Sequence, residues 1–222
     1  MKFVDLKFEN SNASKNSKNN FSAIEKSGKY LLGEFLETFE NNFSKDQNKS
    51  YCIGVKNATD ALSIAFKVLG SENKTVIVPQ FGAYPTVMAA IQSNAKKIIA
   101  APIDERLCLN LDNVEVPKNS IIVPVNLFGN EANLEKIRKI ADETKSFIVE
   151  DCAQSTGLPD NNFSDISIHS FYPTKPLGSK GDGGALLTNN ADWASLFKKI
   201  RFYGLSSGSI ETWGFKIGRA HV

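Results

Sequence analysis

Short apolar runs alternate along this chain with longer segments in which apolar residues recur every three or four positions. The runs have the length and composition of buried strands, and the longer segments have the spacing of amphipathic helices. Predicted strands cover residues 51–55, 75–79, 97–104, 120–125, 147–149, 165–170 and 185–188, and predicted helices cover residues 59–70, 87–91, 133–144 and 192–203. This alternation predicts an α/β fold with a mostly parallel, doubly wound sheet and right-handed crossovers.

Two of the predicted strands lead into chemically capable side chains. Residues 147–149 are followed by Glu150 and Asp151, and the run that begins at Asp165 is followed by Lys175. Parallel sheets deliver ligand-binding side chains at the carboxyl ends of their strands. Asp151 and Lys175 are therefore the leading candidates for a functional site, although most lysines are solvated and an aspartate at a strand end often serves as a cap.

Lys175 lies two residues after Pro173 and directly before Pro176, so its backbone is expected to be stiff and extended rather than helical. An amine held in a dry pocket can form a Schiff base with an aldehyde cofactor. Pyridoxal phosphate (PLP) needs an amine for its aldehyde and an acid for its ring nitrogen. Asp151 would supply that acid, and the pair favours PLP chemistry over a solvated lysine.

A polar turn, Lys56-Asn57-Ala58-Thr59, joins the first strand to the helix at 59–70. Its backbone N–H groups and the Thr59 hydroxyl would face the space off the helix start, where anions bind. Taken alone, an ordinary Asn or Thr cap is the better interpretation. The glycine-rich run at 178–184 matches neither the Walker spacing nor the dinucleotide fingerprint, and it predicts a tight turn between strands.

Composition narrows the class of protein. Of the 222 residues, 41% are hydrophobic and 23% are charged, and no apolar run approaches the length of a membrane span. We therefore expect a soluble protein with no membrane partner. The formal net charge is +2 and the basic residues are dispersed, which favours a small-molecule partner over nucleic acid.

The cysteines indicate a reducing compartment. Cys52, Cys108 and Cys152 are odd in number and widely spaced, with no metal-ligand pattern, so reduced thiols and no metal are expected. Asp5 is an acid where a secretion signal would be apolar, which also favours the cytoplasm. Cys152 with His169 as its base could form a nucleophilic pair, but a small buried core residue is the better interpretation of Cys152.

The first 50 residues are predicted to precede the main domain as an N-terminal segment and helix. Residues 1–20 open with a short alternating piece and become rich in Asn, Ser and Lys, which predicts a mobile loop. Residues 21–43 show helical spacing with a short break at Leu32 and Gly33. The large domain is then expected to span residues 51–205.

With these segments placed, the chain resembles the DegT/DnrJ/StrS group of fold-type I PLP enzymes, the nucleotide-sugar aminotransferases. Gly54–Leu62 is similar to the group's G-V-S-S-G-T-D-A-L turn, and Val125–Gly129 is similar to V-H-L-Y-G. Glu150–Gln154 is similar to E-D-A-A-Q, and Ser170–Lys175 is similar to S-F-[YF]-P-T-K. The motifs occur in the right order over nearly the whole chain, which makes the resemblance far more specific than any single motif.

The resemblance implies a role for each matched residue, within the three-layer α/β/α large domain of PLP-dependent transferases. Lys175 would hold PLP and then move the proton between the substrate carbon and the cofactor. Asp151 would pair with the pyridinium nitrogen, and Gln154 would contact the ring or its 3-oxygen. The residues implied to hold the phosphate are Ala58, Thr59 and Ser170.

The chain also departs from the group's pattern. The group carries an aromatic residue, stacked on the PLP ring, at the position of Ala83, and we expect Tyr84 to replace it or the stacking to be lost. Lys56-Asn57-Ala58 stands where Ser-Ser-Gly is common, which changes the expected phosphate contacts. Asn126 replaces the usual histidine.

Members of the group continue past residue 222 into a smaller carboxyl-terminal domain, so this chain is expected to be truncated, with residues 206–216 beginning the connection to that domain. Residues 217–222 can be encoded by ATC-GGA-AGA-GCA-CAC-GTC, the read-through of a common sequencing adapter, and we expect this tail to be non-native. Re-sequencing of the locus would decide the question, and a natural stop after Val222 with no adapter present would refute the expectation.

The implied activity is PLP-dependent transfer of an amino group, with glutamate as donor, to a keto-sugar nucleotide in amino-sugar and polysaccharide biosynthesis. A homodimer with the site at its interface is implied as well. One alternative is a sugar dehydratase relative that uses the same cofactor, but those enzymes replace the Schiff-base lysine, whereas Lys175 is present. The other alternative is a non-catalytic fragment or binding module.

Overall fold

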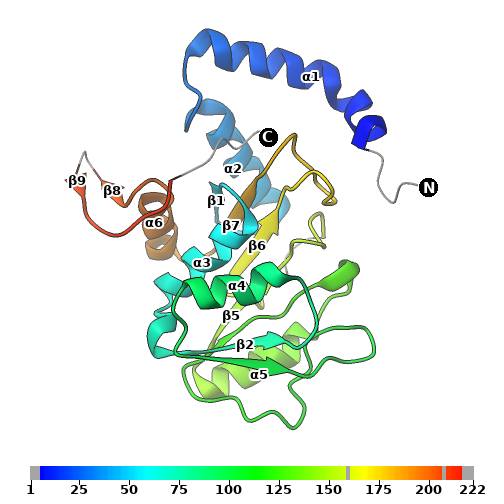
Figure 1. Ribbon diagram of the computed structural model, residues 1–222, viewed down its shortest axis with the longest axis vertical. Helices are drawn as coiled ribbons and strands as arrows, with labels where there is room; N and C mark the ends of the chain where they lie inside the picture. The colour runs from blue at the N-terminus through cyan, green and yellow to red at the C-terminus, as the bar shows by residue number, and fades with distance from the viewer. Residues whose placement is uncertain (1–5, 159–160, 207–208, 217–222) are drawn as a thin grey trace.

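The computed structural model describes residues 6–158, 161–206 and 209–216. Its centre is a seven-stranded sheet with the order β1-β7-β6-β5-β4-β2-β3 (Figure 1). The strands are β1 (Tyr51–Val55), β2 (Thr75–Pro79), β3 (Lys97–Ala101), β4 (Ile121–Ile122), β5 (Phe147–Asp151), β6 (Ile166–Ser170) and β7 (Gly184–Thr188). Strands β2 to β6 run parallel, and β7 is antiparallel to both of its neighbours. The predicted mostly parallel sheet is confirmed.

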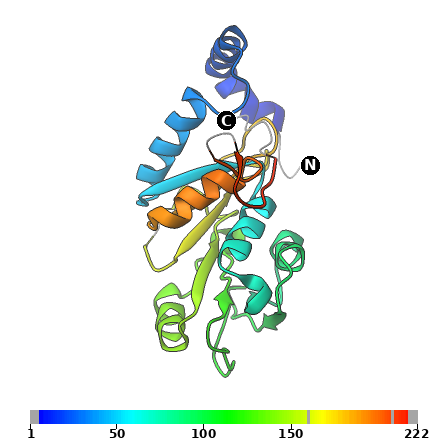
Figure 2. The same ribbon diagram turned by 90° about the vertical axis from the view of Figure 1, so that its left-hand side faces the viewer.

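Helices cover both faces of this sheet, which gives the predicted three layers (Figure 2). One face packs against α3 (Ala58–Val68), α4 (Tyr84–Gln92) and α6 (Ala191–Ile200). The other face packs against α2 (Glu34–Asp46) and α5 (Leu134–Thr144). The strands alternate between these cores: Val76 and Val78 join the α3 side, whereas Ile77 joins the α5 side. Near-continuous burial along a strand follows from this double coverage.

The carboxyl ends of the strands meet along one edge of the sheet. Asp151 ends β5 and Ser170 ends β6, and these strands are paired in parallel with Asp151 opposite Ile168. Strand β1 runs in the same direction and leads into α3 through the turn at Asn57. Side chains from β5, β6 and the start of α3 are therefore delivered to a common region.

The N-terminal prediction was wrong for the residues that the structure describes. Residues 9–20, the Asn-, Ser- and Lys-rich part predicted to form a mobile loop, belong to α1 (Leu6–Ser27), which lies outside the three layers in Figure 1. Residues 1–5 lie outside the described part. Asn and Ser disfavour a helix interior by only ~0.7 kcal/mol or less each, and no glycine or proline interrupts this segment. The predicted break is confirmed, because Gly33 has a φ of 119° and α2 begins at Glu34.

Prolines and a tight contact explain where several elements end early. Strand β3 ends before Pro102 and β4 ends before Pro124, since a proline has no N–H to continue the ladder. Val125 nevertheless forms an isolated parallel bridge with Asp151. Helix α6 ends at Ile200 rather than at 203, and a Cβ on Gly204 would lie 1.8 Å from the carbonyl oxygen of Thr212. The chain therefore turns back on itself here, before the short β8–β9 hairpin (Leu205–Ser206 and Ser209–Ile210). The predicted tail at 217–222 lies outside the described residues.

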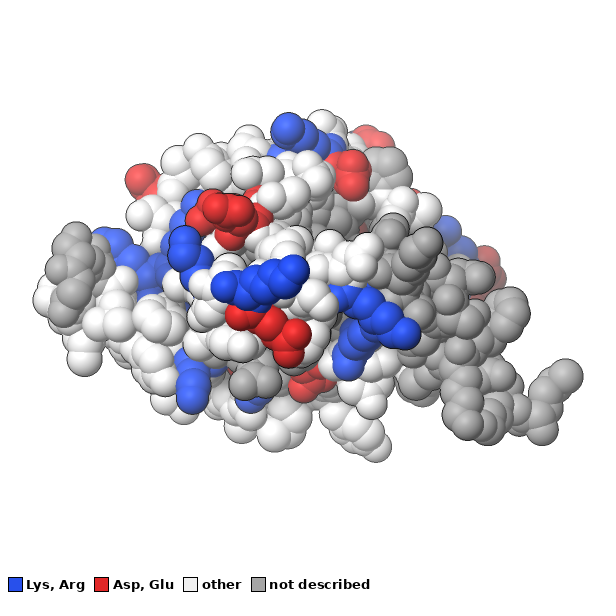
Figure 3. Space-filling model, turned by 90° about the horizontal axis from the view of Figure 1, so that it is seen from above, with Lys and Arg blue, Asp and Glu red and all other residues white. Residues whose placement is uncertain are grey.

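The surface carries charges of both signs. On the part of the face in Figure 3 that the structure describes, Lys and Arg side chains are interspersed with Asp and Glu, in keeping with a formal net charge of +2. Among the helices described, none combines the length and the apolar character needed to cross a bilayer.

Candidate active site

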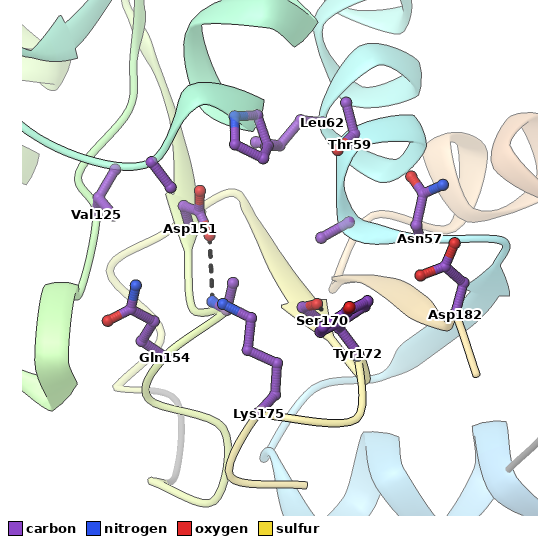
Figure 4. Close-up of a pocket in the computed structure, with 14 residues that line it drawn as sticks. Asn57, Thr59, Leu62, Val125, Asp151, Gln154, Ser170, Tyr172, Lys175 and Asp182 are labelled. Carbon is purple, nitrogen blue, oxygen red and sulfur yellow. Dashed lines mark hydrogen bonds between the residues drawn. The ribbon is translucent and has the colours of Figure 1, made fainter. Parts of the chain in front are cut away.

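A cavity of about 280 Å³ opens at the carboxyl ends of β5 and β6, beside the start of α3. Six of the seven residues predicted to bind the cofactor line this cavity: Lys175, Asp151, Gln154, Ser170, Ala58 and Thr59. They come from segments far apart in the sequence, and Figure 4 shows them grouped around one space. The structure thus brings together the amine, the acid and the helix start.

Asp151 is a buried carboxylate held by neutral donors. It is 5% exposed, and its Oδ2 accepts a hydrogen bond from the Thr86 hydroxyl at 2.8 Å. Its Oδ1 accepts from the N–H of Ala153 at 3.1 Å. Burial raises the pKa of Asp151, while the bonds from Thr86 and Ala153 and the charge of Lys175 act in the opposite direction. An ionised Asp151 is therefore undersatisfied and would gain from a cationic N–H in the cavity.

Lys175 enters the cavity from the loop after β6. Its side chain extends toward Asp151 in Figure 4, and its own N–H donates to the carbonyl of Tyr172 at 2.8 Å. The backbone is thus a turn, and the extended conformation predicted for Lys175 was wrong. Pro173 explains the difference, since its fixed φ suits the second position of a β-turn. A Cβ on Gly178 would lie 2.5 Å from the carbonyl oxygen of Pro173, so this compact loop requires a glycine there.

The start of α3 forms the other end of the cavity. The Asn57 side chain caps the helix by accepting from the N–H of Asp60 at 2.8 Å, which leaves the N–H groups of Ala58 and Thr59 in the first turn, where intrahelical partners are absent. Strand β7 lies directly against this turn, because a Cβ on Gly184 would come within 2.4 Å of the Asn57 carbonyl carbon. Asp182, whose carboxylate would repel an anion, also lines the cavity. An anion at this end would therefore have to be held by the N–H groups of the helix start and by nearby hydroxyls.

Sequence reasoning missed two polar groups that shape the site. Thr86, in the first turn of α4, bonds Asp151 across 65 positions of sequence. The backbone N–H of Phe128 donates to Oε1 of Gln154 at 2.8 Å. A threonine in a helix that follows a buried strand was a weak signal for the first contact. The second involves a main-chain group, and no residue type in the sequence marks it.

Tyr84 is not brought to the cavity. It is 88% exposed at the start of α4, whereas its neighbours Ala83 and Pro85 line the cavity wall. Within the described residues, the position that would carry a stacking aromatic ring is therefore occupied by Ala83.

The cysteine and histidine near the site serve the core. Cys152 is 7% exposed, and its Sγ accepts from Nδ2 of Asn126 at 3.8 Å. His169 lies against the ring of Phe43 and shares a 3.3 Å hydrogen bond with the Thr156 hydroxyl through Nδ1. Burial, followed by the charge of Lys49, lowers the pKa of His169 to about 3. The environment of His169 favours the interpretation of these residues as core rather than as a nucleophilic pair.

The chain is similar to known proteins in sequence and in fold. The family model for "DegT/DnrJ/EryC1/StrS aminotransferase family" matches residues 11–219. The dTDP-3-amino-3,4,6-trideoxy-alpha-D-glucose transaminase of Micromonospora megalomicea subsp. nigra is 35% identical over 188 residues, which are 81% of this chain and 50% of the relative. Among solved structures, S. venezuelae DesV in complex with a ketimine intermediate superposes with a TM-score of 0.90 at 30% identity, covering 96% of this chain and 60% of DesV.

A second solved structure, of NtdA from Bacillus subtilis with bound cofactor PMP, has a TM-score of 0.88 at 27% identity and covers 97% of this chain and 52% of NtdA. The chain therefore spans about half the length of the relatives that it matches.

Proposed function

The chain belongs to the DegT/DnrJ/EryC1/StrS aminotransferase family, and we propose on this premise that it forms the PLP-binding large domain of an aminotransferase acting on keto-sugar nucleotides. One observation carries the proposal: the buried Asp151 and the side chain of Lys175 face a single cavity whose far end is the start of α3. These three features match the three ends of PLP, which are its ring nitrogen, its aldehyde and its phosphate.

The chemistry of the residues fits the cofactor. Burial raises the pKa of Asp151, and no described residue places a cation in contact with this carboxylate, so a protonated ring nitrogen would supply one. The N–H groups of Ala58 and Thr59 and the hydroxyl of Ser170 offer donors to a phosphate. Lys175 is the lysine among the cavity's lining residues, so its amine is the group available for the aldehyde.

The chain's own residues would perform distinct tasks in the reaction. When bound, PLP supplies an electron sink that lets a substrate carbon exchange a proton. Nζ of Lys175 would hold the cofactor and, once released from it, carry the proton to and from that carbon. Oδ1 and Oδ2 of Asp151 would keep the proton on the ring nitrogen. The walls formed by Leu62 and Val125 would exclude water from the amine.

The substrate and the donor follow from relatives rather than from contacts in this chain. The transaminase of M. megalomicea is named for a dTDP-linked amino sugar, which supports a keto-sugar nucleotide as acceptor here. Glutamate is proposed as the amino donor, and amino-sugar and polysaccharide biosynthesis as the context. Cys52, Cys108 and Cys152 are buried and form no disulfide with one another, which supports a cytoplasmic location, where thiols stay reduced.

We further propose a homodimer. Large apolar side chains are exposed on α4 and the loops near the cavity: Phe81 (51%), Tyr84 (88%), Met88 (43%), Ile91 (53%) and Phe128 (71%). Exposed apolar residues gathered in one region favour an interaction site over bulk solvent. A second copy seated there would lie next to Ala83 and Pro85, which line the cavity.

Borohydride trapping tests the proposal directly. The chain is incubated with PLP, and its visible absorption band is recorded. It is then reduced and digested, and the labelled lysine is identified by mass spectrometry. We expect the label on Lys175, and we expect both label and band to be lost in Lys175→Ala. Lys180→Ala is the matched control, since Lys180 lies in the same loop between β6 and β7 but is exposed and does not line the cavity. A label on other lysines only, or no band, would count against PLP binding.

Turnover is a separate question from PLP binding. A chain that binds PLP on Lys175 but transfers no amino group to a panel of keto-sugar nucleotides would support the alternative of a non-catalytic fragment. The dehydratase alternative is disfavoured because Lys175 enters the cavity.

A further inference from the structure

We propose that Asn126 is a positioning residue, which holds the turn at Leu127–Gly129 so that the N–H of Phe128 fixes the Gln154 side chain with its NH₂ group toward the cavity. The inference rests on the proposed function, because the NH₂ group acquires a role only when PLP occupies the site. It deepens that function by assigning the direction of one hydrogen bond to the cofactor.

The first step is the orientation of Gln154. A glutamine amide has one oxygen that accepts and one nitrogen that donates. The N–H of Phe128 is a donor at 2.8 Å, so the atom that it contacts must be Oε1. Figure 4 shows this oxygen on the side of Gln154 away from Lys175. The Nε2 donors are then left to face a ligand in the cavity that Gln154 lines.

The second step is the unusual backbone of the turn. Phe128 has a φ of 56°, a left-handed conformation that a bulky residue rarely adopts. The residue is 71% exposed, so burial does not hold it in this conformation. The cause must lie in the residues that flank Phe128.

The third step is Asn126, which ties the turn at both ends. The residue is 2% exposed, and its Nδ2 donates to Oε1 of Glu150 at 2.7 Å and to the Ser155 hydroxyl at 3.2 Å. Its own N–H donates to the carbonyl of Asp151 at 3.0 Å. On the far side of the turn, the N–H of Ala132 donates to Oδ1 of Asn126 at 3.4 Å. The turn that carries Phe128 is thus fastened to β5, the strand that also ends in Asp151.

The consequence for bound PLP has a definite sign. A donor aimed at the cofactor's ring oxygen stabilises the anionic form of that oxygen and so favours loss of the nearby proton. Without the donor, the pH at which the visible band of bound PLP changes should rise. If Asn126 served only the stability of the fold, its replacement would lower thermal stability but would leave the pH midpoint of the PLP band unchanged.

The first experiment needs no cofactor. Hydrogen exchange of the Phe128 amide is measured by NMR in the chain as it stands and in Asn126→Leu, which keeps the branched shape of the side chain and removes both of its hydrogen-bonding ends. We expect at least a tenfold loss of protection in Asn126→Leu. Asn130→Ser is the control, since Asn130 lies in the same segment and its side chain bonds the carbonyl of Arg106 instead. Unchanged protection of Phe128 in Asn126→Leu would overturn the proposal.

The second experiment covers the case in which Asn126→Leu fails to fold. Gln154→Glu keeps the size and the acceptor for Phe128 but removes the donor, so Phe128 should stay protected while the band midpoint of bound PLP rises by about one pH unit, a tenfold change in proton affinity. An unshifted midpoint contradicts the proposed direction of the amide. If the unaltered chain shows no band at all, the proposed function fails, and with it this assignment, whereas the exchange result still reports separately on the turn.

Discussion

Glu40 and Asp151 are both buried carboxylates, with 7% and 5% exposure, but the protein holds them in opposite ways. Glu40, on α2, accepts from the N–H of Gly54 at 2.7 Å and forms an ion pair with Arg201, which is itself only 9% exposed. Arg201 also donates to the carbonyl of Gly54 at 3.2 Å. These side chains thereby join α2 and the end of α6 to the edge strand β1.

Asp151 has no such cation in contact among the described residues. It receives hydrogen bonds from neutral groups, and Lys175 acts on it only as a nearby charge. The difference teaches how to tell a structural acid from a functional one. A buried carboxylate already matched with a guanidinium is committed to the fold, whereas one with a raised pKa beside a cavity is available to a ligand.

Breaking the structural pair should produce the largest effect. Glu40→Gln leaves Arg201 buried without its carboxylate, and removal of one partner of a buried pair typically costs about 3–5 kcal/mol. Urea denaturation would measure this loss. PLP affinity of the folded fraction should stay within about twofold of the original, since that pair does not line the cavity. Arg201→Met in the Glu40→Gln background should recover part of the stability, and a loss below about 1 kcal/mol in Glu40→Gln would contradict the structural assignment.

Changing Asp151 should do the reverse. In its proposed role Asp151 makes a charge-assisted bond to the ring nitrogen of PLP, and such a bond is worth about 1.5–3 kcal/mol, so Asp151→Asn should lower PLP affinity by roughly 10- to 150-fold. Spectroscopic titration with PLP is the measurement, with Glu40→Gln as the cross-control. If both variants lost PLP affinity equally, the contrast between the two carboxylates would not hold.

The sequence predicted those features that depend on local periodicity. Each strand shows as an apolar run, and the convergence of Asp151 and Ser170 follows because parallel strands end at one edge. The place of Lys175 beside the cavity could be predicted because it follows one of these strand ends closely. Strand β4 is shorter than predicted, but Val125, which lies beyond its end, still forms a parallel bridge with Asp151. The segment after β4 therefore stays alongside β5.

Features that depend on pairing between distant segments could not be predicted. Thr86 meets Asp151 across 65 positions, and Glu40 meets Arg201 across 161. The case of Tyr84 is subtler. Helix α4 begins at Tyr84, three residues before the start predicted at residue 87. Neighbouring helical residues point about 100° apart, so an error in the helix start leaves the side chain that faces the cavity undetermined. The low helix propensity of Asn and Ser also led to the wrong prediction for α1, which contains no glycine or proline.

The pH dependence of stability sharpens the comparison further. Burial raises the pKa of Asp151 in the folded chain. The stability associated with its proton is therefore present at low pH and is lost as pH rises through the folded pKa. Without PLP, Asp151→Asn should gain stability relative to the original chain between pH 4 and pH 8. Denaturation curves at several pH values test this, and a parallel pH dependence in the two proteins would refute it.

The smallest expected effect concerns Thr86, whose hydroxyl partly stabilises the ionised Asp151. Thr86→Val keeps the shape and removes the 2.8 Å bond, which should cost about 1 kcal/mol at neutral pH and raise the pKa of Asp151 further. The decline in stability with rising pH should then extend to a higher pH and be larger in total, because it starts at the unchanged pKa of Asp151 in the unfolded chain and ends at the folded pKa, while Thr86→Ser should behave like the original chain. A loss after Thr86→Val that is equal at pH 4 and pH 8 would assign Thr86 to packing alone. A loss confined to the higher pH would identify its hydroxyl as the donor that keeps Asp151 ready for a cationic partner.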